Sequence, residues 1–257
     1  MRMTLPRVVA PEVLDSLPAQ DPMAQRSRRD LRRVHRAMGT RRTLVCALRA
    51  LPMRRAHTPS SAPLTVLELG AGDGSLMLGV ARSLHPEFSP VALTLLDRQP
   101  LLTQATVSEY AGSGWTVTAQ VCDALDWAVD ASASRLAPQA APRWDLIVAN
   151  LFLHHFKRTE LAALLAAVAA SSDRFLACEP RRAWIAWAGS HLIGALGVNA
   201  VTREDAVLSV HAGFRDHELS SLWPGSASTW TLAEYPAGLF SHCFVAARAT
   251  TASTGAL

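Results

Sequence analysis

The sequence predicts an α/β protein whose sheet is mostly parallel and is covered by helices on both faces. Three observations lead to this prediction. Short apolar runs alternate with amphipathic helical segments from residue 64 to residue 180. A turn with three glycines in five residues joins the first apolar run to the first of these helices. Two further runs, at 230–237 and 239–249, follow one another without a helix, which indicates a terminal antiparallel hairpin.

Helices are expected before the sheet begins, over residues 21–51. Asp21 is followed by proline, a combination typical of an N-cap and the first helical position. The apolar residues that follow recur at helical spacing in a narrow stripe: Leu31, Val34 and Met38. We expect Gly39 to interrupt this helix, which restarts over residues 43–51. The sequence therefore predicts a helical extension ahead of the sheet.

The α/β part itself begins after a loop rich in proline and serine at 57–63. Strands are expected at 64–69, 91–97, 115–123, 143–150 and 174–180, and helices at 75–84, 101–111 and 159–170. Residues 125–137 carry a mixed pattern that predicts neither. We divide the chain into an N-terminal helical segment, 1–56, and an α/β domain, 57–257.

Composition excludes several classes of protein. Hydrophobic residues make up 49% of the chain, enough for a sizeable core. The four cysteines show no metal-binding spacing and read as reduced thiols. No apolar run reaches the length of a membrane span, and the first residues lack the apolar core of a signal peptide. We therefore expect a cytoplasmic protein.

The glycine-rich turn is the first candidate for a functional site. Gly70, Gly72 and Gly74 stand between a strand and a helix, where the backbone can approach a nucleotide-type ligand. Asp97 and Asp123 end the next two strands. Because carboxyl ends of parallel strands meet at one edge of a sheet, we expect glycines and carboxylates side by side. A carboxylate at the end of the second strand suits the two hydroxyls of a ribose.

Four stretches carry a resemblance to a known family. ELGAGDG (68–74), LLD (95–97), CDALDW (122–127) and DLIVANLFLHHF (145–156) resemble the successive motifs of class I S-adenosylmethionine-dependent methyltransferases. The resemblance covers roughly residues 43–249 and implies a Rossmann-like seven-stranded sheet ending in an antiparallel hairpin. LFLHHF and CEP resemble the ubiquinone/menaquinone-biosynthesis type. Residues 197–224 resemble small bacterial methyltransferases associated with type III polyketide synthases, which are thought to modify phenolic products.

This resemblance implies a site for S-adenosylmethionine. The residues that match the cofactor-binding motifs are Glu68, Gly70, Gly72, Gly74, Asp97, Asp123, Ala124, Asn150 and Leu151. Asp97 would take the ribose hydroxyls, and Asp123 the adenine amino group. Asn150 and Leu151 would lie beside the methionine amine. Asp73 is either a further contact or the cap of the helix that follows it.

The methyl acceptor is expected to be a small molecule, in particular the hydroxyl of a phenolic or polyketide-type compound. Such a hydroxyl needs a base. His154 and His155, which follow the fourth strand, are the leading candidates, and His191 and His211 are the others. The resemblance implies that the segment after the fifth strand walls the acceptor pocket, with Trp184, Trp187 and His191 as lining. Glu179 is either a contact for a polar substrate group or part of a solvated turn. No cluster of metal ligands is evident, so no metal is expected.

Other functions remain open at this point. Ring C-methylation of a quinol or polyketide needs the same deprotonation as O-methylation. RNA methylation is disfavoured, because the fourth strand ends in ANLF and not in an Asn-Pro-Pro-aromatic signature. A nicotinamide dehydrogenase would also use the glycines and Asp97, but the spacing is GxGxG rather than GxGxxG. A binding protein that keeps the fold without activity is the remaining alternative.

Charge is unevenly distributed along the chain. Eleven arginines lie between Arg26 and Arg55, although the net charge is only +4. A basic helix of this kind binds nucleic acid, an anionic substrate or a carrier, or it docks as a lid or dimer contact with solvated arginines. The segment has no Phe, Tyr or Trp on which a base would stack, so nucleic acid is disfavoured. The resemblance favours a lid over the active site, and a homodimer contact is the companion expectation.

Overall fold

The computed structural model describes residues 5–51, 53, 62–136, 143–226 and 228–249, and these form a single α/β unit around one sheet. The strands in the described part of the chain are β1 (Leu64–Leu69), β2 (Val91–Asp97), β3 (Trp115–Val121), β4 (Leu146–Asn150), β5 (Arg174–Pro180), β6 (Trp230–Ala237) and β7 (Ser241–Arg248). Their order across the sheet is β3-β2-β1-β4-β5-β7-β6. The first five strands are parallel, and β7 runs antiparallel to both β5 and β6. The predicted Rossmann-like sheet with its terminal hairpin is confirmed.

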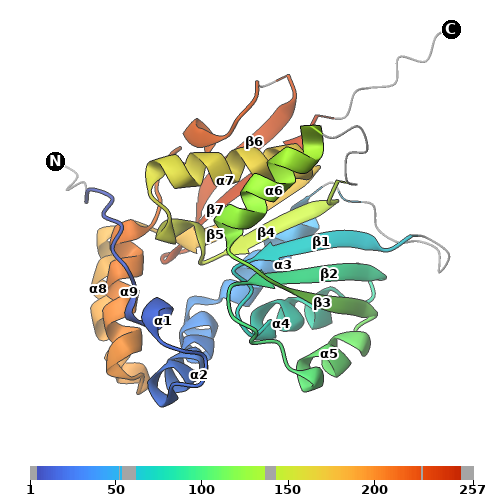
Figure 1. Cartoon of the computed structure of the whole chain (residues 1–257). Coiled ribbons are helices and arrows are strands. Elements are labelled where there is room, and N and C mark those ends of the chain that lie inside the picture. Colours follow the sequence, from blue (N-terminus) through green and yellow to red (C-terminus); the bar gives the residue numbers. More distant parts are fainter. Residues whose placement is uncertain (1–4, 52, 54–61, 137–142, 227, 250–257) are drawn as a thin grey trace, which may run out of the picture.

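Helices cover both faces of this sheet (Figure 1). On one face lie α3 (Thr40–Ala50), α4 (Ser75–Leu84) and α5 (Gln104–Ala111). On the other lie α6 (Ala124–Leu136) and α7 (Arg158–Ser171). Each face has its own apolar core, because strands buried on both sides send alternate side chains in opposite directions. Leu67 and Leu69 of β1 enter the core beneath α7, whereas Val66 enters the core beneath α4.

A third group of helices lies at one end of the sheet, seen at the lower left of Figure 1. It consists of α1 (Val13–Ser16), α2 (Pro22–Met38), α8 (Trp184–Leu192) and α9 (Ala200–Ala212), with the short 3₁₀ turn η2 (Ile193–Leu196). Helix α9 packs against α1, α2 and α8. Elements from both ends of the sequence therefore come together beside the carboxyl ends of the parallel strands.

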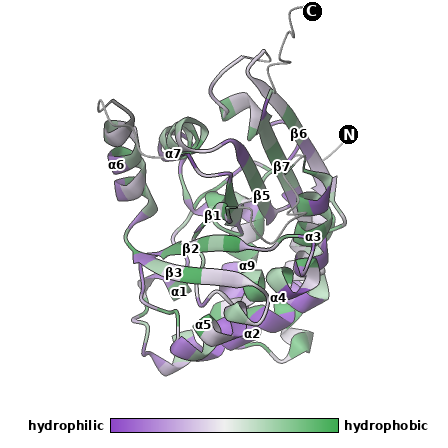
Figure 2. Cartoon of the chain, turned by 90° about the vertical axis from the view of Figure 1, so that its right-hand side faces the viewer, coloured by the Kyte–Doolittle hydropathy of each residue, from purple (hydrophilic) through white to green (hydrophobic). Residues whose placement is uncertain are grey.

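The N-terminal helices follow the sequence-based expectation closely. The Asp21 side chain accepts hydrogen bonds from the backbone of Met23 and Ala24 and caps α2. Gly39 has a φ of 70°, a left-handed conformation that ends α2 before α3 begins. In Figure 2 hydrophilic and hydrophobic bands alternate along α2. Helix α3, in contrast, packs its apolar side on α4.

One segment differs from the sequence-based expectation. Residues 125–137, which predicted no element, are largely helical, since α6 ends at Leu136. Small residues such as Ala124 and Ala128 let α6 approach α7 closely, so this helix lacks the wide apolar stripe on which periodicity depends. The predicted boundary between residues 56 and 57 lies outside the described residues and stays a prediction. None of the described helices combines the length and hydropathy that crossing a membrane requires.

Candidate active site

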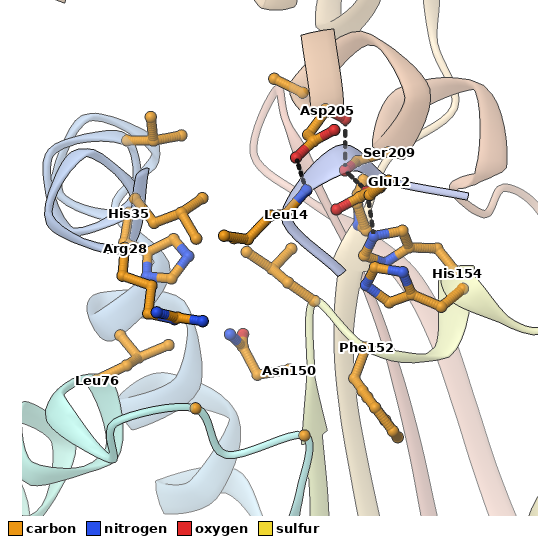
Figure 3. Close-up of a pocket in the computed structure, with 18 of the residues that line it drawn as sticks. Glu12, Leu14, Arg28, His35, Leu76, Asn150, Phe152, His154, Asp205 and Ser209 are labelled. Carbon is orange, nitrogen blue, oxygen red and sulfur yellow. Dashed lines mark hydrogen bonds and ion pairs between the residues drawn. The ribbon is translucent and has the colours of Figure 1, made fainter. Parts of the chain in front are cut away.

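A cavity of about 820 Å³ lies between the carboxyl ends of the parallel strands and the third group of helices (Figure 3). The glycine-rich turn, the loop after β2, the loop after β3 and the segment after β4 form its floor. Residues of α1, α2, α8 and α9 close it from above. Its volume is within the range of about 300–1,000 Å³ that is typical of ligand pockets. Every residue that was predicted to bind the cofactor lines the cavity except Gly74.

The three glycines of the turn are needed for different geometric reasons. All three have a positive φ, of 67°, 58° and 72° for Gly70, Gly72 and Gly74. A Cβ on Gly70 would lie 2.1 Å from the ring of Phe152, and one on Gly74 would lie 2.7 Å from Leu95. A Cβ on Gly72 would meet no atom within 4 Å. Two of the glycines are thus required by the protein itself, and the space in front of Gly72 is free for a ligand.

Two buried acceptor atoms in the described part of the cavity have no hydrogen-bond partner. They are Oε2 of Glu68, at the end of β1, and Oδ1 of Asn150, at the end of β4. Burial, together with the negative charges of Asp97 and Asp73, raises the pKa of Glu68 to about 8. A buried acceptor without a partner is costly, and here two converge on one wall. The wall suits a cationic ligand group with several N–H donors.

Carboxylates of the next two strand ends complete the floor. Asp97 accepts hydrogen bonds from the backbone of Gly72 and Gln99, both at 2.9 Å. The Asp123 side chain accepts from the backbone of Leu125 at 2.8 Å and lies at the cavity wall beside Ala124. Both side chains are fixed by backbone donors before any ligand binds. Asp73 accepts from the backbone of Ser75 at the start of α4 and forms an ion pair with Arg32 of α2 at 3.0 Å.

The end of β4 has an unusual backbone. Leu151 has a φ of 49°, a left-handed conformation that is uncommon for a residue with a branched side chain. Its backbone N–H donates to the carbonyl oxygen of Cys178 on β5. This geometry turns the chain out of the sheet directly after Asn150 and directs the following residues, up to His155, along the cavity. The strain coincides with the predicted site.

His154 lies between two carboxylates. Its Nδ1 is 2.8 Å from Oε2 of Glu179, and its Nε2 is 3.3 Å from Oε1 of Glu12. Burial by itself would lower the pKa of His154, but the bonds to Glu12 and Glu179 raise it to about 9. His154 is therefore protonated at neutral pH and has no free nitrogen. Because both ring nitrogens of His154 face carboxylates, the geometry favours His155 over His154 as the base, and this role stays a prediction.

Glu179 was left open by the sequence, and the structure gives it a clear role. It is fully buried and accepts hydrogen bonds from the backbone of Phe152, Leu153 and His154 as well as from the His154 ring. It is neither part of a solvated turn nor placed to meet a substrate. Glu179 instead fixes the segment that follows β4.

His155 is the more accessible of the two histidines, with 22% of its side chain exposed. Its Nδ1 lies 3.1 Å from Oδ2 of Asp15 in α1. Among the described residues, no side chain or backbone group is hydrogen-bonded to its Nε2. The two histidine rings are tilted, with centroids 4.2 Å apart, and both line the cavity. His155 is thus the histidine of this pair with a nitrogen free for chemistry.

The segment around α1 is held in place by several long-range contacts. Asp205 of α9 accepts hydrogen bonds from the backbone of Val13 and Leu14. Ser209 donates to Glu12, which in turn meets His154 (Figure 3). Burial would raise the pKa of Glu12, but the hydrogen bond with His154 and the charge of His154 lower it. Glu12 is therefore a carboxylate at neutral pH and anchors the segment to the site.

The structure does not place Trp184, Trp187 and His191 at the cavity that they were predicted to line. Trp184 and Trp187 are 71% and 40% exposed, and none of the three residues borders the cavity. The opposite side of α8 forms the wall, with Ala186 and Gly189. Residues at i, i+3 and i+7 of a helix share one face, and here that face points to solvent. Ala186 and Gly189 are small residues, which carry little signal in the sequence.

Polar side chains of α2 also line the cavity, which the sequence did not predict. Arg28 and His35 lie on the side of the cavity opposite Glu12 and His154 (Figure 3). Arg28 donates to the side chain of Gln99 at 2.7 Å and to the backbone of Ala19. Burial lowers the pKa of His35 to about 4, so this histidine is neutral. The apolar stripe of α2 was identified, but nothing in its spacing indicated which polar residues accompany the stripe into the cavity.

Glu12, His154 and His155 bring possible metal-ligand atoms within 4.8 Å of one another. The sequence did not anticipate this cluster, because Glu12 is more than 140 residues away from the two histidines. In the structure both ring nitrogens of His154 already face carboxylates. The expectation of no metal stays a prediction.

Comparison with known proteins places the fold. No family model matches the chain, and no curated protein matches its sequence. Among solved structures, the pyocyanin biosynthetic protein PhzM has a TM-score of 0.50 at 16% identity, over 90% of this chain and 60% of PhzM. Magnesium protoporphyrin IX methyltransferase from Synechocystis PCC 6803, with bound S-adenosylhomocysteine, has a TM-score of 0.44 at 14% identity, over 92% of this chain and 91% of that one. The CurJ carbon methyltransferase has a TM-score of 0.43 at 19% identity, over 75% and 50%.

The fold is Rossmann-like. At these identities the likeness extends to the arrangement of the sheet and its helices, and the chain spans less than two thirds of PhzM. Because one fold supports many activities, function has to be argued from the residues of the cavity.

Proposed function

We propose that the protein transfers a methyl group from S-adenosylmethionine to a small-molecule acceptor. The observation that carries this proposal is the pair of unpartnered buried acceptors, Glu68 Oε2 and Asn150 Oδ1, beside the open space at Gly72. An α-ammonium group supplies the N–H donors that these atoms lack. The ribose and adenine of the same ligand would then extend past Asp97 and Asp123 along the edge of the sheet.

The charge of the site supports this ligand over a dinucleotide. Asp97 and Asp123 bring two carboxylates to the cavity floor. Glu68 adds a carboxyl group whose raised pKa of about 8 keeps it largely protonated at neutral pH, and Asp73 beside the glycines is paired with Arg32 at 3.0 Å. A diphosphate placed against this turn would meet like charges, which raise the cost of binding. S-adenosylmethionine has a sulfonium and an ammonium in the corresponding region. The acidic floor therefore favours the sulfonium cofactor over a nicotinamide dinucleotide.

The cavity residues also suggest how the acceptor is handled. When bound, the cofactor supplies a methyl group on a sulfonium, and the protein positions the acceptor in line with it and excludes water. Apolar side chains of α2, α8 and η2, among them Leu31, Ala186 and Ile193, suit a flat apolar compound. His155 accepts the proton of the acceptor hydroxyl on Nε2, and the resulting oxygen attacks the methyl carbon.

We infer that the acceptor is a phenolic or polyketide-type compound methylated on oxygen. A phenol has an apolar body for the helical wall and one ionisable hydroxyl for His155. Methylation of a ring carbon beside such a hydroxyl would begin with the same deprotonation. The resemblance of residues 197–224 to methyltransferases associated with type III polyketide synthases points to the same class of compound.

A transfer assay tests the proposal. The protein is incubated with S-adenosylmethionine labelled on its methyl group and a panel of alkylphenols, dihydroxyarenes and quinols, and extracted products are analysed for label and its position. Transfer to at least one compound, lost in Asp97→Asn and His155→Gln but kept in Asp130→Asn on the exposed side of α6, is the expected result. Binding of the cofactor with no transfer across the panel would favour a binding protein that keeps the fold.

A further inference from the structure

We propose that Asp15, from the N-terminal segment, is the positioning residue for His155, so that the reactive histidine is completed only by a segment far away in the sequence. This inference rests on the proposed function, because it concerns the proton acceptor of the same reaction. Asp15 belongs to none of the methyltransferase-like motifs. It reaches the site because α1 docks between the end of β4 and α9.

The contact between Asp15 and His155 selects one form of the imidazole. Oδ2 of Asp15 lies 3.1 Å from Nδ1 of His155. A carboxylate in this position accepts the Nδ1 proton and thereby leaves the lone pair on Nε2. Burial would raise the pKa of Asp15, but the hydrogen bond to His155, the charge of His155 and the charge of Arg98 lower it. Asp15 is therefore an anion that orients the ring and stabilises the imidazolium formed when Nε2 takes a proton.

The position of Asp15 depends on the neighbouring residues of its own segment. Asp205 holds the backbone of Val13 and Leu14, and Glu12 is bound by Ser209 and His154. Arg98, which follows β2, donates to the backbone oxygen of Asp15 and pairs with its carboxylate at 3.3 Å. These contacts come from α9, from the end of β4 and from the loop beside Asp97. The segment is thus fixed on three sides. Because its backbone is held, the short side chain of Asp15 keeps its carboxylate against His155.

The two adjacent histidines differ in the number of carboxylates in direct contact, two for His154 and one for His155. His154 is enclosed by Glu12 and Glu179 and carries a proton, and its positive ring lies 4.2 Å from that of His155. This neighbour opposes a second proton on His155, and so does Arg98 on the far side of Asp15. Asp15 is the carboxylate in direct contact with His155 and counteracts both charges. Removing Asp15 leaves the Glu12 carboxylate to oppose these two cations, which makes the protonated form of His155 harder to reach.

The direct test is a titration of His155 by NMR in protein with labelled histidine, saturated with S-adenosylhomocysteine. The His155→Gln spectrum assigns the signal. We expect Asp15→Asn to lower the titration midpoint of His155 by about one pH unit, because an opposite charge in contact is removed. Asp15→Glu keeps the carboxylate and is expected to retain most of the effect. An unchanged midpoint in Asp15→Asn would overturn the proposal.

Arg98→Gln serves as the matched control, because it removes the contacts of Arg98 with the backbone and carboxylate of Asp15 but keeps the Asp15 carboxylate itself. The midpoint should stay or rise in this variant, since a positive charge is lost. A fall equal to that in Asp15→Asn would show that the segment acts through docking alone and would overturn the proposal. Asp15 is exposed and its replacement by asparagine keeps its size, so we expect Asp15→Asn to fold.

Activity toward a phenol identified in the transfer assay gives a second readout. Asp15→Asn should lower kcat by about 10- to 100-fold and move the acid limb of its pH profile to lower pH, with cofactor affinity within about twofold of the wild type. Failure of the wild-type protein to bind S-adenosylhomocysteine would instead count against the proposed function. Normal binding with an unaltered kcat in Asp15→Asn would count against the role of Asp15 alone.

Discussion

Oδ2 of Asp97 accepts a hydrogen bond of 2.9 Å from the backbone N–H of Gly72. The carboxylate at the end of β2 therefore fixes the turn that follows β1 before any ligand is present. Together with the open space in front of Gly72, this contact makes the turn a preformed surface rather than a flexible loop. A preformed surface loses little conformational entropy when a ligand binds.

The first prediction concerns the space in front of Gly72. In Gly72→Ala the added methyl group would point into the cavity, and we expect affinity for S-adenosylhomocysteine to fall at least about 100-fold because direct contact is blocked. The left-handed backbone should cost about 1–2 kcal/mol of folding free energy. Isothermal titration and chemical denaturation measure the two effects.

Gly238→Ala is the matched control, because Gly238 has a φ of 75° and its Cβ would also meet no atom within 4 Å. It lies in the turn between β6 and β7, outside the cavity. The same loss of stability with unaltered cofactor affinity is expected. Equal loss of affinity in both variants would mean that strain, not contact, explains the result.

Binding should release a proton from Glu68. The pKa of this buried carboxyl is about 8 in the free protein, and a bound ammonium would lower it by favouring the ionised form. Affinity for S-adenosylhomocysteine should therefore increase between about pH 6.5 and pH 8, by up to tenfold per unit. Titrations in buffers of different ionisation enthalpy count the released protons, and Glu68→Gln should release none. Identical heats in all buffers would contradict an ammonium beside Glu68.

His154 should make stability depend on pH. Its pKa is about 9 in the folded protein, above the usual value, so its contribution is complete below about pH 6.5 and is lost as the pH rises through 9. We expect His154→Gln to cost about 3 kcal/mol at low pH and on the order of 2 kcal/mol less once the pH exceeds 9. Chemical denaturation of this variant, compared with His217→Gln at an exposed site, measures the difference. A cost independent of pH would show that His154 is neutral.

Substitutions on the two faces of α8 are expected to have opposite effects on methyl transfer. Ala186→Phe should abolish methyl transfer while cofactor affinity is kept, because the new ring fills the apolar part of the cavity. Trp184→Ala, on the outer face, should alter activity less than about twofold and stability by less than about 0.5 kcal/mol. Transfer assays on both variants decide between the two faces. Loss of activity in Trp184→Ala alone would restore the tryptophan face as the acceptor wall.

The parts of the site that were predicted from sequence are those encoded locally. The end of each strand is marked by an apolar run that stops at a glycine or a carboxylate, and in a parallel sheet these ends must meet. Gly72, Asp97 and Asp123 could therefore be placed at one edge before any coordinates were known. Strand β1 and helix α4 have the predicted bounds for the same reason.

The rest of the site depends on contacts that leave no local pattern. Glu12 and His154 are 142 residues apart, and Asp205 caps α1 from a distance of 192 residues. Helix α8 is apolar on both sides, so periodicity could not show which side faces the cavity. Trp184 and Trp187 stand out in the sequence by their size, whereas the small residues Ala186 and Gly189 on the cavity side of α8 carry no comparable signal.

The most direct measurement is isothermal titration of the purified protein with S-adenosylhomocysteine and, separately, with NADH, repeated on Asp97→Asn. The account predicts micromolar or tighter binding of S-adenosylhomocysteine, a loss of at least about tenfold in the variant, and no binding of NADH. Binding of NADH in place of S-adenosylhomocysteine, or binding of neither, would contradict the account. If neither bound, the three glycines would form a tight structural turn and no ligand site.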